Sequence, residues 1–328
     1  MLTNKRIHFR ADGNTELGLG HLIRCQSLAE MIKKKYRIRF YCRLIPEAIQ
    51  KNLVESGFQV KIIREEKEFF DTLQAGDGVV IDGYSFGPAY YYDVRDKGCK
   101  LIVIDDLHRE KFCADLIINP SPGVSSDHYE MESDCSALQL FALGPKYALL
   151  RPAFLTSELK RTVYKEPAHL FICFGGSDAK NLTEKVLRCA LDFKQFGKIT
   201  IITGSGYLHH HELERRYSHD ENVRFFHAVN DQFMAEKLAE ADVAVVPSSG
   251  MLYEALSMQV KVISGMYVDN QKNMYEGFKR MNAFIDAGTF NKEMLMAAFT
   301  RVKSFKPETI IDRKSPERYR AQFETVMK

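Results

Sequence analysis

The feature that most constrains this chain is an alternation of short apolar runs with helix-patterned stretches, and this alternation starts twice. Arg6–Arg10 has the pattern of a strand and enters a glycine-rich turn at Gly13–Gly20. His169–Phe174 has the same pattern and enters a second glycine turn at Gly175–Asp178. Strands that alternate with helices predict a parallel sheet with right-handed crossovers. The sequence therefore predicts an α/β protein made of two Rossmann-like domains with parallel sheets.

Apolar periodicity places the remaining elements and the domain boundary. Further strands are expected at Ile38–Cys42, Gln59–Ile63, Gly78–Asp82, Lys100–Asp105, Leu116–Asn119, Lys198–Thr203, Val223–Phe226, Val243–Pro247 and Val260–Ser264. Helices are expected at His21–Lys34, Glu47–Ser56, Ala89–Lys97, Lys180–Phe193, His210–Arg216, Asp231–Glu240 and Met251–Met258. A polar stretch at Tyr147–Glu166 interrupts the alternation and is predicted to be the linker. We therefore expect domains at 1–158 and 159–328, and we consider that the amphipathic final segment, Asp312–Met327, packs back on the first domain.

The composition supports a folded chain and argues against several classes of partner. The 328 residues suit two domains of roughly 150 residues each. With 45% apolar and 27% charged residues the chain is too apolar to be disordered. A net charge of +3 is too small to indicate a nucleic-acid-binding surface. No apolar run is long enough to predict a membrane-spanning helix. We expect no nucleic-acid partner and no membrane insertion, and a monomer is the working hypothesis.

The N-terminal residues and the cysteines indicate the cellular compartment in which the protein is expected. The first ten residues lack the apolar core and cleavage site of a secretory signal. The seven cysteines are scattered, and none forms a CxxC pair. We therefore expect reduced, mostly buried thiols in a cytoplasmic protein.

Ligands of open parallel sheets bind at the carboxyl ends of the strands, so the cleft between two such domains is the expected site. Gly18-Leu19-Gly20-His21 follows the first strand and opens a helix, where backbone N–H groups favour an anion. Ile23 occupies the third glycine position of the dinucleotide fingerprint, and no GK[ST] sequence follows either glycine turn. NAD and a P-loop are therefore disfavoured. His21 is a candidate general base, because imidazole titrates near neutral pH, or else a packed or capping histidine.

Acidic residues follow three strands of the first half. Asp12 either orients His21 or ties down its own turn as an Asx cap. Asp82 and the pair Asp105-Asp106 end neighbouring strands, where they either hold a metal or a proton or, as we favour for the pair, cap and anchor loops. Tyr84 is placed to hydrogen-bond a sugar.

The second half offers candidate phosphate contacts. Backbone N–H groups at Gly175, Gly176 and Ser177 are placed to meet a phosphate. Ser248, Ser249 and Gly250 precede a helix and predict either a diphosphate cradle or plain N-capping by serine. Glu254, one turn further on, is either a ribose ligand or an acid favoured by the helix dipole. A metal at His209–His211 is disfavoured, because three adjacent histidines cannot all face one way on a helix.

Several motifs resemble, in order along residues 6 to about 285, those of the UDP-2,4-diacetamido-2,4,6-trideoxy-β-L-altropyranose hydrolases of pseudaminic acid biosynthesis. The matching stretches are Arg10-Ala-Asp-Gly-Asn, Gly18-Leu-Gly-His-Leu-Ile-Arg24, Ile81-Asp-Gly-Tyr84, Ile104-Asp-Asp106, Asp115-Leu-Ile-Ile-Asn119, Tyr147-Ala-Leu-Leu-Arg151, Cys173-Phe-Gly-Gly-Ser-Asp-Ala-Lys-Asn181, Ser248-Ser-Gly-Met-Leu-Tyr-Glu254 and Asp269-Asn-Gln271. That family is similar to the bacterial transferase that adds GlcNAc to lipid I, which has the two-domain GT-B glycosyltransferase fold.

The resemblance implies a GT-B fold in which the C-terminal half holds UDP and the N-terminal half holds the sugar, without a metal or other cofactor. It implies that His21 activates a water that attacks the anomeric carbon and displaces UDP with inversion. The residues assigned to the sugar side are Asp12, Gly18, Leu19, Gly20, Arg24 and Tyr84, and those assigned to UDP are Gly175, Gly176, Ser177, Ser248, Ser249, Gly250, Glu254 and Asn270.

Two other functions stay open at this point. The first is a GT-B glycosyltransferase that uses a UDP-sugar in surface polysaccharide synthesis. A lipid acceptor would call for an apolar or basic patch, for which Lys33–Arg39 with Tyr36 is the only candidate. The second is a nucleotide-sugar-binding module without turnover, against which the presence of His21 argues.

Overall fold

The computed structural model describes residues 5–14, 17–108, 111–130, 135, 137–159, 168–306 and 308–328. Its contacts divide the chain into two compact units. Unit 1 comprises Met1–Pro152 together with Arg313–Lys328, and unit 2 comprises Ala153–Asp312. The division lies six residues before the expected boundary at 158, and part of the expected linker, residues 160–167, lies outside the described residues.

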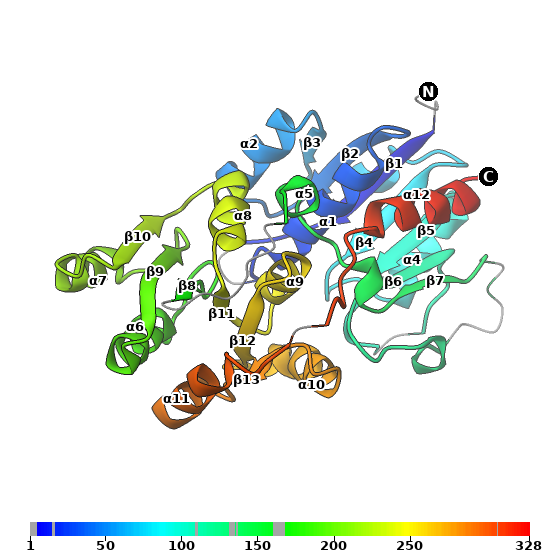
Figure 1. The fold of residues 1–328 in the computed structure, drawn as a ribbon. Helices are drawn as coiled ribbons and strands as arrows, with labels where there is room; N and C mark the ends of the chain where they lie inside the picture. Colours follow the sequence, from blue (N-terminus) through cyan, green and yellow to red (C-terminus); the bar gives the residue numbers. More distant parts are fainter. Residues whose placement is uncertain are drawn as a thin grey trace. The chain divides into compact units, whose positions relative to one another are not determined.

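Unit 1 is built on a seven-stranded sheet in which all neighbouring strands are parallel, in the order β3-β2-β1-β4-β5-β6-β7 (Figure 1). Its strands are β1 (Arg6–Ala11), β2 (Arg37–Cys42), β3 (Gln59–Ile62), β4 (Gly78–Asp82), β5 (Lys100–Ile104), β6 (Leu116–Asn119) and β7 (Leu140–Leu143). Its helices are α1 (Gly20–Ile32), α2 (Glu47–Glu55), α3 (Lys67–Phe70), α4 (Pro88–Asp96) and α12 (Ser315–Val326). Strand β4 is buried along its whole length, because apolar β-branched residues on both of its faces are covered.

Helix α12 joins unit 1 although it follows unit 2 in the sequence. It packs against α1 and β7. The Tyr319 hydroxyl donates a 2.6 Å hydrogen bond to the Tyr147 carbonyl oxygen, and Phe323 lies against Tyr36. The last helix therefore completes the core of the first unit, so the range 159–328 is not one continuous unit.

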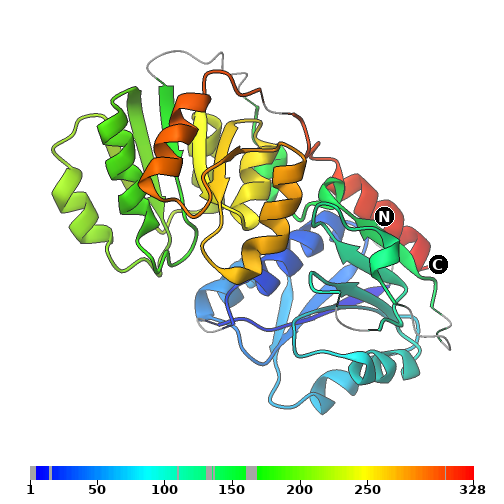
Figure 2. The same cartoon turned by 90° about the horizontal axis from the view of Figure 1, so that it is seen from below.

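Unit 2 is built on a six-stranded parallel sheet in the order β10-β9-β8-β11-β12-β13. Its strands are β8 (Ala168–Ile172), β9 (Phe196–Thr203), β10 (Val223–His227), β11 (Val243–Pro247), β12 (Lys261–Gly265) and β13 (Ile285–Asp286). Its helices are α6 (Leu182–Phe193), α7 (His210–Tyr217), α8 (Asp231–Ala239), α9 (Gly250–Ser257), α10 (Lys272–Arg280) and α11 (Lys292–Arg301), and the short α5 (Pro152–Thr156) lies at the junction of the units. Helices α6 and α11 pack against each other on the sheet (Figure 2).

The two units share one topology. In each, the first strand lies between the second and the fourth, so the direction in which strands are added reverses there. Such a reversal point, β1/β4 in unit 1 and β8/β11 in unit 2, is where doubly wound sheets bind ligands. The predicted α/β class and all the predicted strands are confirmed, with small shifts at their ends. The helices and strands that the sequence pattern missed are α3, β7, α10, β13 and α11.

The cysteine prediction is wrong for one pair. Cys113 and Cys135 form a disulfide, with their Cα atoms 5.3 Å apart. The two residues are 22 positions apart, and sequence spacing alone does not reveal that approach. The other five cysteines are buried thiols, as expected. Among the described residues, no helix has the length and apolar character needed to cross a lipid bilayer.

Candidate active site

His21 and Asp82 meet at the reversal point of unit 1. His21 is the second residue of α1, and Asp82 is the last residue of β4, the neighbour of β1 in the sheet. The His21 Nδ1 atom lies 2.7 Å from Asp82 Oδ1, and both side chains are largely buried. Asp82, which is 61 positions away in the sequence, therefore holds the His21 imidazole.

Arg24 joins this pair to a second carboxylate. Its Nε and Nη2 atoms donate to the two oxygens of Asp82 at 2.5 and 2.6 Å, and its Nη1 atom donates to Asp106 Oδ2 at 2.9 Å. The Tyr84 hydroxyl donates to the same Asp106 oxygen at 3.2 Å, and the Tyr84 ring meets the His21 ring edge-on at 4.7 Å between centroids. Tyr84 is 60% exposed, so the cluster ends at the surface in an aromatic side chain.

The charge state of Asp82 fixes the tautomer of His21. Burial alone would raise the pKa of Asp82, but the Arg24 guanidinium and the His21 hydrogen bond outweigh burial and lower that pKa. An ionised carboxylate only accepts hydrogen bonds, so the His21 Nδ1 atom carries the proton that it shares with Asp82. The Arg24 Nη2 atom, 3.1 Å from Nδ1, is a second donor to the same Asp82 oxygen. The lone pair of a neutral His21 then lies on Nε2, which makes no hydrogen bond to any described residue. This arrangement suits a general base.

The lowered pKa of Asp82 predicts how stability depends on pH. The pKa of the Asp82 carboxyl is about 3.9 in the unfolded chain and lower in the folded protein. Between these two values the unfolded chain binds more protons than the folded protein does. The stabilisation is fully present above pH ~4 and is lost as the pH falls through the folded pKa. We expect the free energy of unfolding, measured by urea denaturation from pH 7 to pH 3, to fall below pH ~4 and to fall less steeply in Asp82→Asn. The same pH dependence in both proteins would contradict this assignment.

Asp12 does not orient His21. Its carboxylate accepts hydrogen bonds from the backbone N–H groups of Arg43 and Leu44 at 2.6 and 3.0 Å and pairs with Arg10 at 2.8 Å. Arg10 is buried and also pairs with Glu66. These contacts lie outside its own turn, so they are not those of the expected Asx cap, and its charge holds the turn after β1 against the loop after β2.

The glycine turn before His21 leaves its backbone open. Gly18 has φ +81°, and a Cβ atom at Gly18 or Gly20 would meet nothing within 4 Å. Leu19 is the N-cap residue of α1 and makes no side-chain capping bond within the described chain. The first N–H groups of α1 therefore have no capping side chain, in contrast to a helix that begins with Ser, Asp or Asn.

In unit 2 the predicted residues gather at the carboxyl ends of three neighbouring strands, β8, β11 and β12. Gly176 and Ser177 are exposed after β8. Gly204 and Gly206 pack on this turn, and the Gly206 N–H donates to the Gly176 carbonyl oxygen at 3.0 Å. A Cβ atom at Gly204 would lie 2.4 Å from that oxygen, so only glycine permits the contact.

The N-termini of α6 and α9 differ in whether a side chain caps them. Asp178 caps α6, accepting from the N–H groups of Leu182 and Thr183 at 2.9 and 2.8 Å. Ser249 makes no capping bond to α9 among the described residues, and the Ser248 hydroxyl pairs with Ser264 instead. The structure therefore does not show the N-capping of α9 by Ser248 or Ser249 that was the alternative prediction. The start of α9, where a Cβ atom on Gly250 would meet nothing, suits an anion.

Glu254 lies one turn into α9, and Asn270 follows β12, the strand next to β11. Glu254 is 6% exposed on α9, and Asn270 is exposed in the 3₁₀ turn Asp269–Gln271 that follows β12. The Gln271 side chain accepts from the Tyr267 N–H at 3.0 Å and so holds the loop that carries Asn270.

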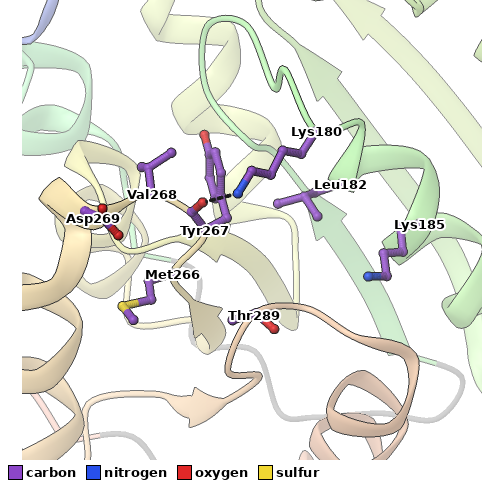
Figure 3. Close-up of a pocket in the computed structure, with 8 residues that line it drawn as sticks. All are labelled: Lys180, Leu182, Lys185, Met266, Tyr267, Val268, Asp269 and Thr289. Carbon is purple, nitrogen blue, oxygen red and sulfur yellow. Dashed lines mark hydrogen bonds between the residues drawn. The ribbon is translucent and has the colours of Figure 1, made fainter.

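A pocket of about 380 Å³ that the sequence did not reveal lies next to this loop (Figure 3). Lys180 reaches across it and donates from Nζ to the Tyr267 carbonyl oxygen at 2.5 Å. This bond ties the segment after Gly175–Asp178 to the segment that carries Asn270. Lining residues are Lys180, Leu182, Lys185, Met266, Tyr267, Val268, Asp269 and Thr289.

Asp105 and Asp106, which follow β5, bind a loop and Arg24, respectively. The loop-anchoring role that we favoured for the pair is thus seen for Asp105. Asp105 accepts from the N–H groups of Leu107 and His108 at 3.2 and 3.1 Å. Asp106 binds Arg24, so the two carboxylates do not face a common ion.

On α7, the ligand atoms of His210, His211 and Glu214 lie within 4.8 Å of one another, and His209 is not part of this group. His210 is held through Nδ1 by Thr203 Oγ1 at 3.0 Å, while the other two side chains are exposed. Such exposed groups are common without an ion, so no metal site is assigned to them.

Comparison with known proteins supports the resemblance found in the sequence. No family model matches the chain. It is 26% identical to the UDP-2,4-diacetamido-2,4,6-trideoxy-β-L-altropyranose hydrolase of Campylobacter jejuni over 82% of this chain and 94% of that protein. It is 26% identical to the spore coat polysaccharide biosynthesis protein SpsG of Bacillus subtilis over 90% of this chain and 88% of that protein. It is 27% identical to the uncharacterized protein MJ1062 of Methanocaldococcus jannaschii over 83% of this chain, and it spans 58% of that protein's length.

Solved structures identify the fold. MurG of Acinetobacter baumannii aligns over 98% of both chains with a TM-score of 0.61 at 14% identity. UGT71G1 of Medicago truncatula, solved with UDP-glucose, aligns over 97% of this chain and 93% of its own with a TM-score of 0.61 at 11% identity. The two parallel α/β units are those of the GT-B glycosyltransferase fold, which confirms the predicted fold class.

Proposed function

We propose that this protein is a UDP-sugar hydrolase of surface polysaccharide biosynthesis whose substrate is UDP-2,4-diacetamido-2,4,6-trideoxy-β-L-altropyranose. The observation that carries the proposal is the His21–Asp82 pair, in which the imidazole Nε2 atom keeps its lone pair at the reversal point of unit 1. The similarity to a hydrolase of that name, along most of both chains, supports the choice of substrate.

In the proposed reaction, His21 Nε2 takes a proton from a water molecule as the water oxygen bonds to the anomeric carbon. The bond between that carbon and the diphosphate oxygen breaks, and its electron pair leaves with UDP. Asp82 stabilises the imidazolium that forms, as a carboxylate does in hydrolytic triads. Water attacks the face opposite the leaving group, so the configuration inverts, by analogy with inverting glycosidases.

The charge of the leaving diphosphate requires compensation on unit 2. We assign this role to the uncapped start of α9 at Ser248, Ser249 and Gly250 and to the exposed turn Gly175–Ser177. Helix N-termini and backbone N–H groups stabilise such charge without a metal ion. Glu254 is assigned to the ribose and Asn270 to the substrate.

A glycosyltransferase remains the second candidate, because the solved relatives with this fold include transferases. The segment Lys33–Arg39, the candidate patch for a lipid acceptor, is partly held by contacts within unit 1. Tyr36 is 3% exposed, Lys33 pairs with Glu30, and Lys35 pairs with Glu324. The apolar residues of this segment, Tyr36 and Ile38, are thus buried, while Lys34, Arg37 and Arg39 are exposed.

The deciding experiment is to measure UDP release from the proposed substrate in buffer with EDTA and without an acceptor. We expect release of UDP together with the free sugar in its inverted form, at a rate that EDTA does not change. Absence of release from this and a panel of other UDP-sugars, with UDP still bound, would favour the transferase. Loss of release with EDTA, restored by a divalent metal, would contradict the metal-independent mechanism.

Glu254→Ala is expected to weaken UDP binding by about tenfold, because a hydrogen bond between a carboxylate and the ribose contributes about that factor. The Kd for UDP by calorimetry and kcat at saturating substrate test this expectation. Glu254→Gln, which keeps the shape of the side chain, is the matched control and should lose less. A fall in kcat with an unchanged Kd would show that the ribose assignment is wrong.

A further inference from the structure

A second histidine stands at the same edge of unit 1 and has no role in the proposed chemistry. His108 follows β5 in a left-handed backbone conformation, with φ +53°. Histidine adopts this region more readily than most residues, but a non-glycine residue there is still uncommon and tends to mark functional sites. Its side chain is only partly buried, and Asp106, two residues earlier, belongs to the cluster around His21.

A buried asparagine sets the tautomer of His108. Asn119, at the end of β6, is fully buried, and its Oδ1 atom accepts from the Ser121 N–H at 2.9 Å. That backbone donor fixes which end of the amide is the NH₂ group. The NH₂ group then donates to His108 Nε2 at 2.8 Å and to the Tyr129 hydroxyl at 2.9 Å. His108 Nε2 is therefore an acceptor, and a neutral His108 carries its proton on Nδ1.

The remaining contacts hold His108 in place. The Tyr129 hydroxyl donates a hydrogen bond to Asp105 Oδ2 at 3.1 Å, and the His108 backbone N–H donates to the same oxygen at 3.1 Å. The Tyr129 ring meets the His108 ring edge-on at 5.0 Å between centroids. Burial, helped by the neighbouring His128, outweighs Asp105 and lowers the pKa of His108, so its ring is neutral at pH 7. Within the described part of the chain, the Nδ1–H group has no acceptor.

We infer that His108 is a specificity residue whose Nδ1–H group binds the carbonyl oxygen of an N-acylated amino sugar, an inference that rests on the proposed function. The Nδ1–H group is a donor in a fixed place, so it suits an oxygen that only accepts, such as an amide carbonyl. Strands β4 and β6, which end in Asp82 and Asn119, are two strand spacings or about 10 Å apart. A pyranose with an acylated amine can bridge that span while its anomeric carbon lies at His21.

The test uses binding, so that it does not depend on turnover. Affinities for UDP, UDP-glucose, UDP-N-acetylglucosamine and the diacetamido substrate are measured by calorimetry in the His21→Ala background, with and without His108→Phe. We expect His108→Phe to weaken binding of the two N-acylated compounds by about tenfold and to leave UDP and UDP-glucose within about twofold. His108→Asn, which tolerates the left-handed backbone, should give the same loss and guards against a folding defect.

His128→Phe is the matched control, because His128 is an exposed imidazole with its ring 5.8 Å from that of His108. It should change none of the four affinities. Equal losses for UDP and for the N-acylated compounds would place His108 on the diphosphate and overturn the inference, as would no loss at all. If the wild-type protein hydrolysed none of these compounds, the proposed function would fail, while the affinities would still decide the role of His108.

Discussion

His21→Ala is expected to lower kcat by about 10³-fold while the Kd for UDP stays within about twofold. General base catalysis contributes about 10² to 10⁴ in rate, and His21 belongs to the unit that we do not assign to UDP. Steady-state kinetics with the proposed substrate and calorimetry with UDP measure the two quantities.

The chain provides a matched control for this substitution. His8 is also buried and also bound to an aspartate, with its Nε2 atom 3.1 Å from Asp77 Oδ2. Asp77 precedes β4, whereas Asp82 ends it, so this pair lies toward the opposite edge of the sheet. His8→Ala should lower the melting temperature and leave kcat nearly unchanged. A retained rate in His21→Ala, or an equal loss in His8→Ala, would remove His21 as the base.

Asp82→Asn is expected to lower kcat by about 10² to 10⁴-fold and also to destabilise the protein. An amide no longer fixes the Nδ1–H tautomer of His21, so the lone pair on Nε2 is lost in much of the population. It also removes one of the two carboxylates that pair with the Arg24 guanidinium and leaves only Asp106, which we expect to cost about 1–3 kcal/mol. The measurements are kcat and the free energy of unfolding in urea.

Asp77→Asn separates the two effects, because it breaks the other histidine–aspartate pair of the same unit. It should reduce stability without reducing kcat. If Asp82→Asn kept the wild-type rate once its stability was restored by a lower assay temperature, the orienting role of Asp82 would be disproved.

The alternation of strands and helices made most of the architecture predictable. Local periodicity depends only on which faces of a strand or helix are buried, so the sequence pattern located β1, β4 and β8 and the glycine turns after them. Several of the elements that it missed, such as α3 and β13, are short, and α10 and α11 lie on either side of β13, a strand of only two residues. Fold class, and the placement of candidate residues after strands, follow from this local information.

The partners of those residues do not follow from it. Asp12 is the acid nearest to His21 in the sequence, but Arg10 and two backbone N–H groups hold it. Asp82 holds His21 instead, because β4 is added beside β1 when the sheet reverses direction. The general rule that β4 neighbours β1 in doubly wound sheets was the signal that could have identified Asp82.

The sequence by itself thus determined the α/β class, the doubled pattern and His21 as a candidate base, because these depend on the order of polar and apolar residues along the chain. Only the tertiary structure decided that Asp82 and Arg24 hold His21 and that Asn119 sets the tautomer of His108. Each of these is a contact between residues brought together by strand order and packing, and the free energy of such contacts is not encoded in any local window of the sequence.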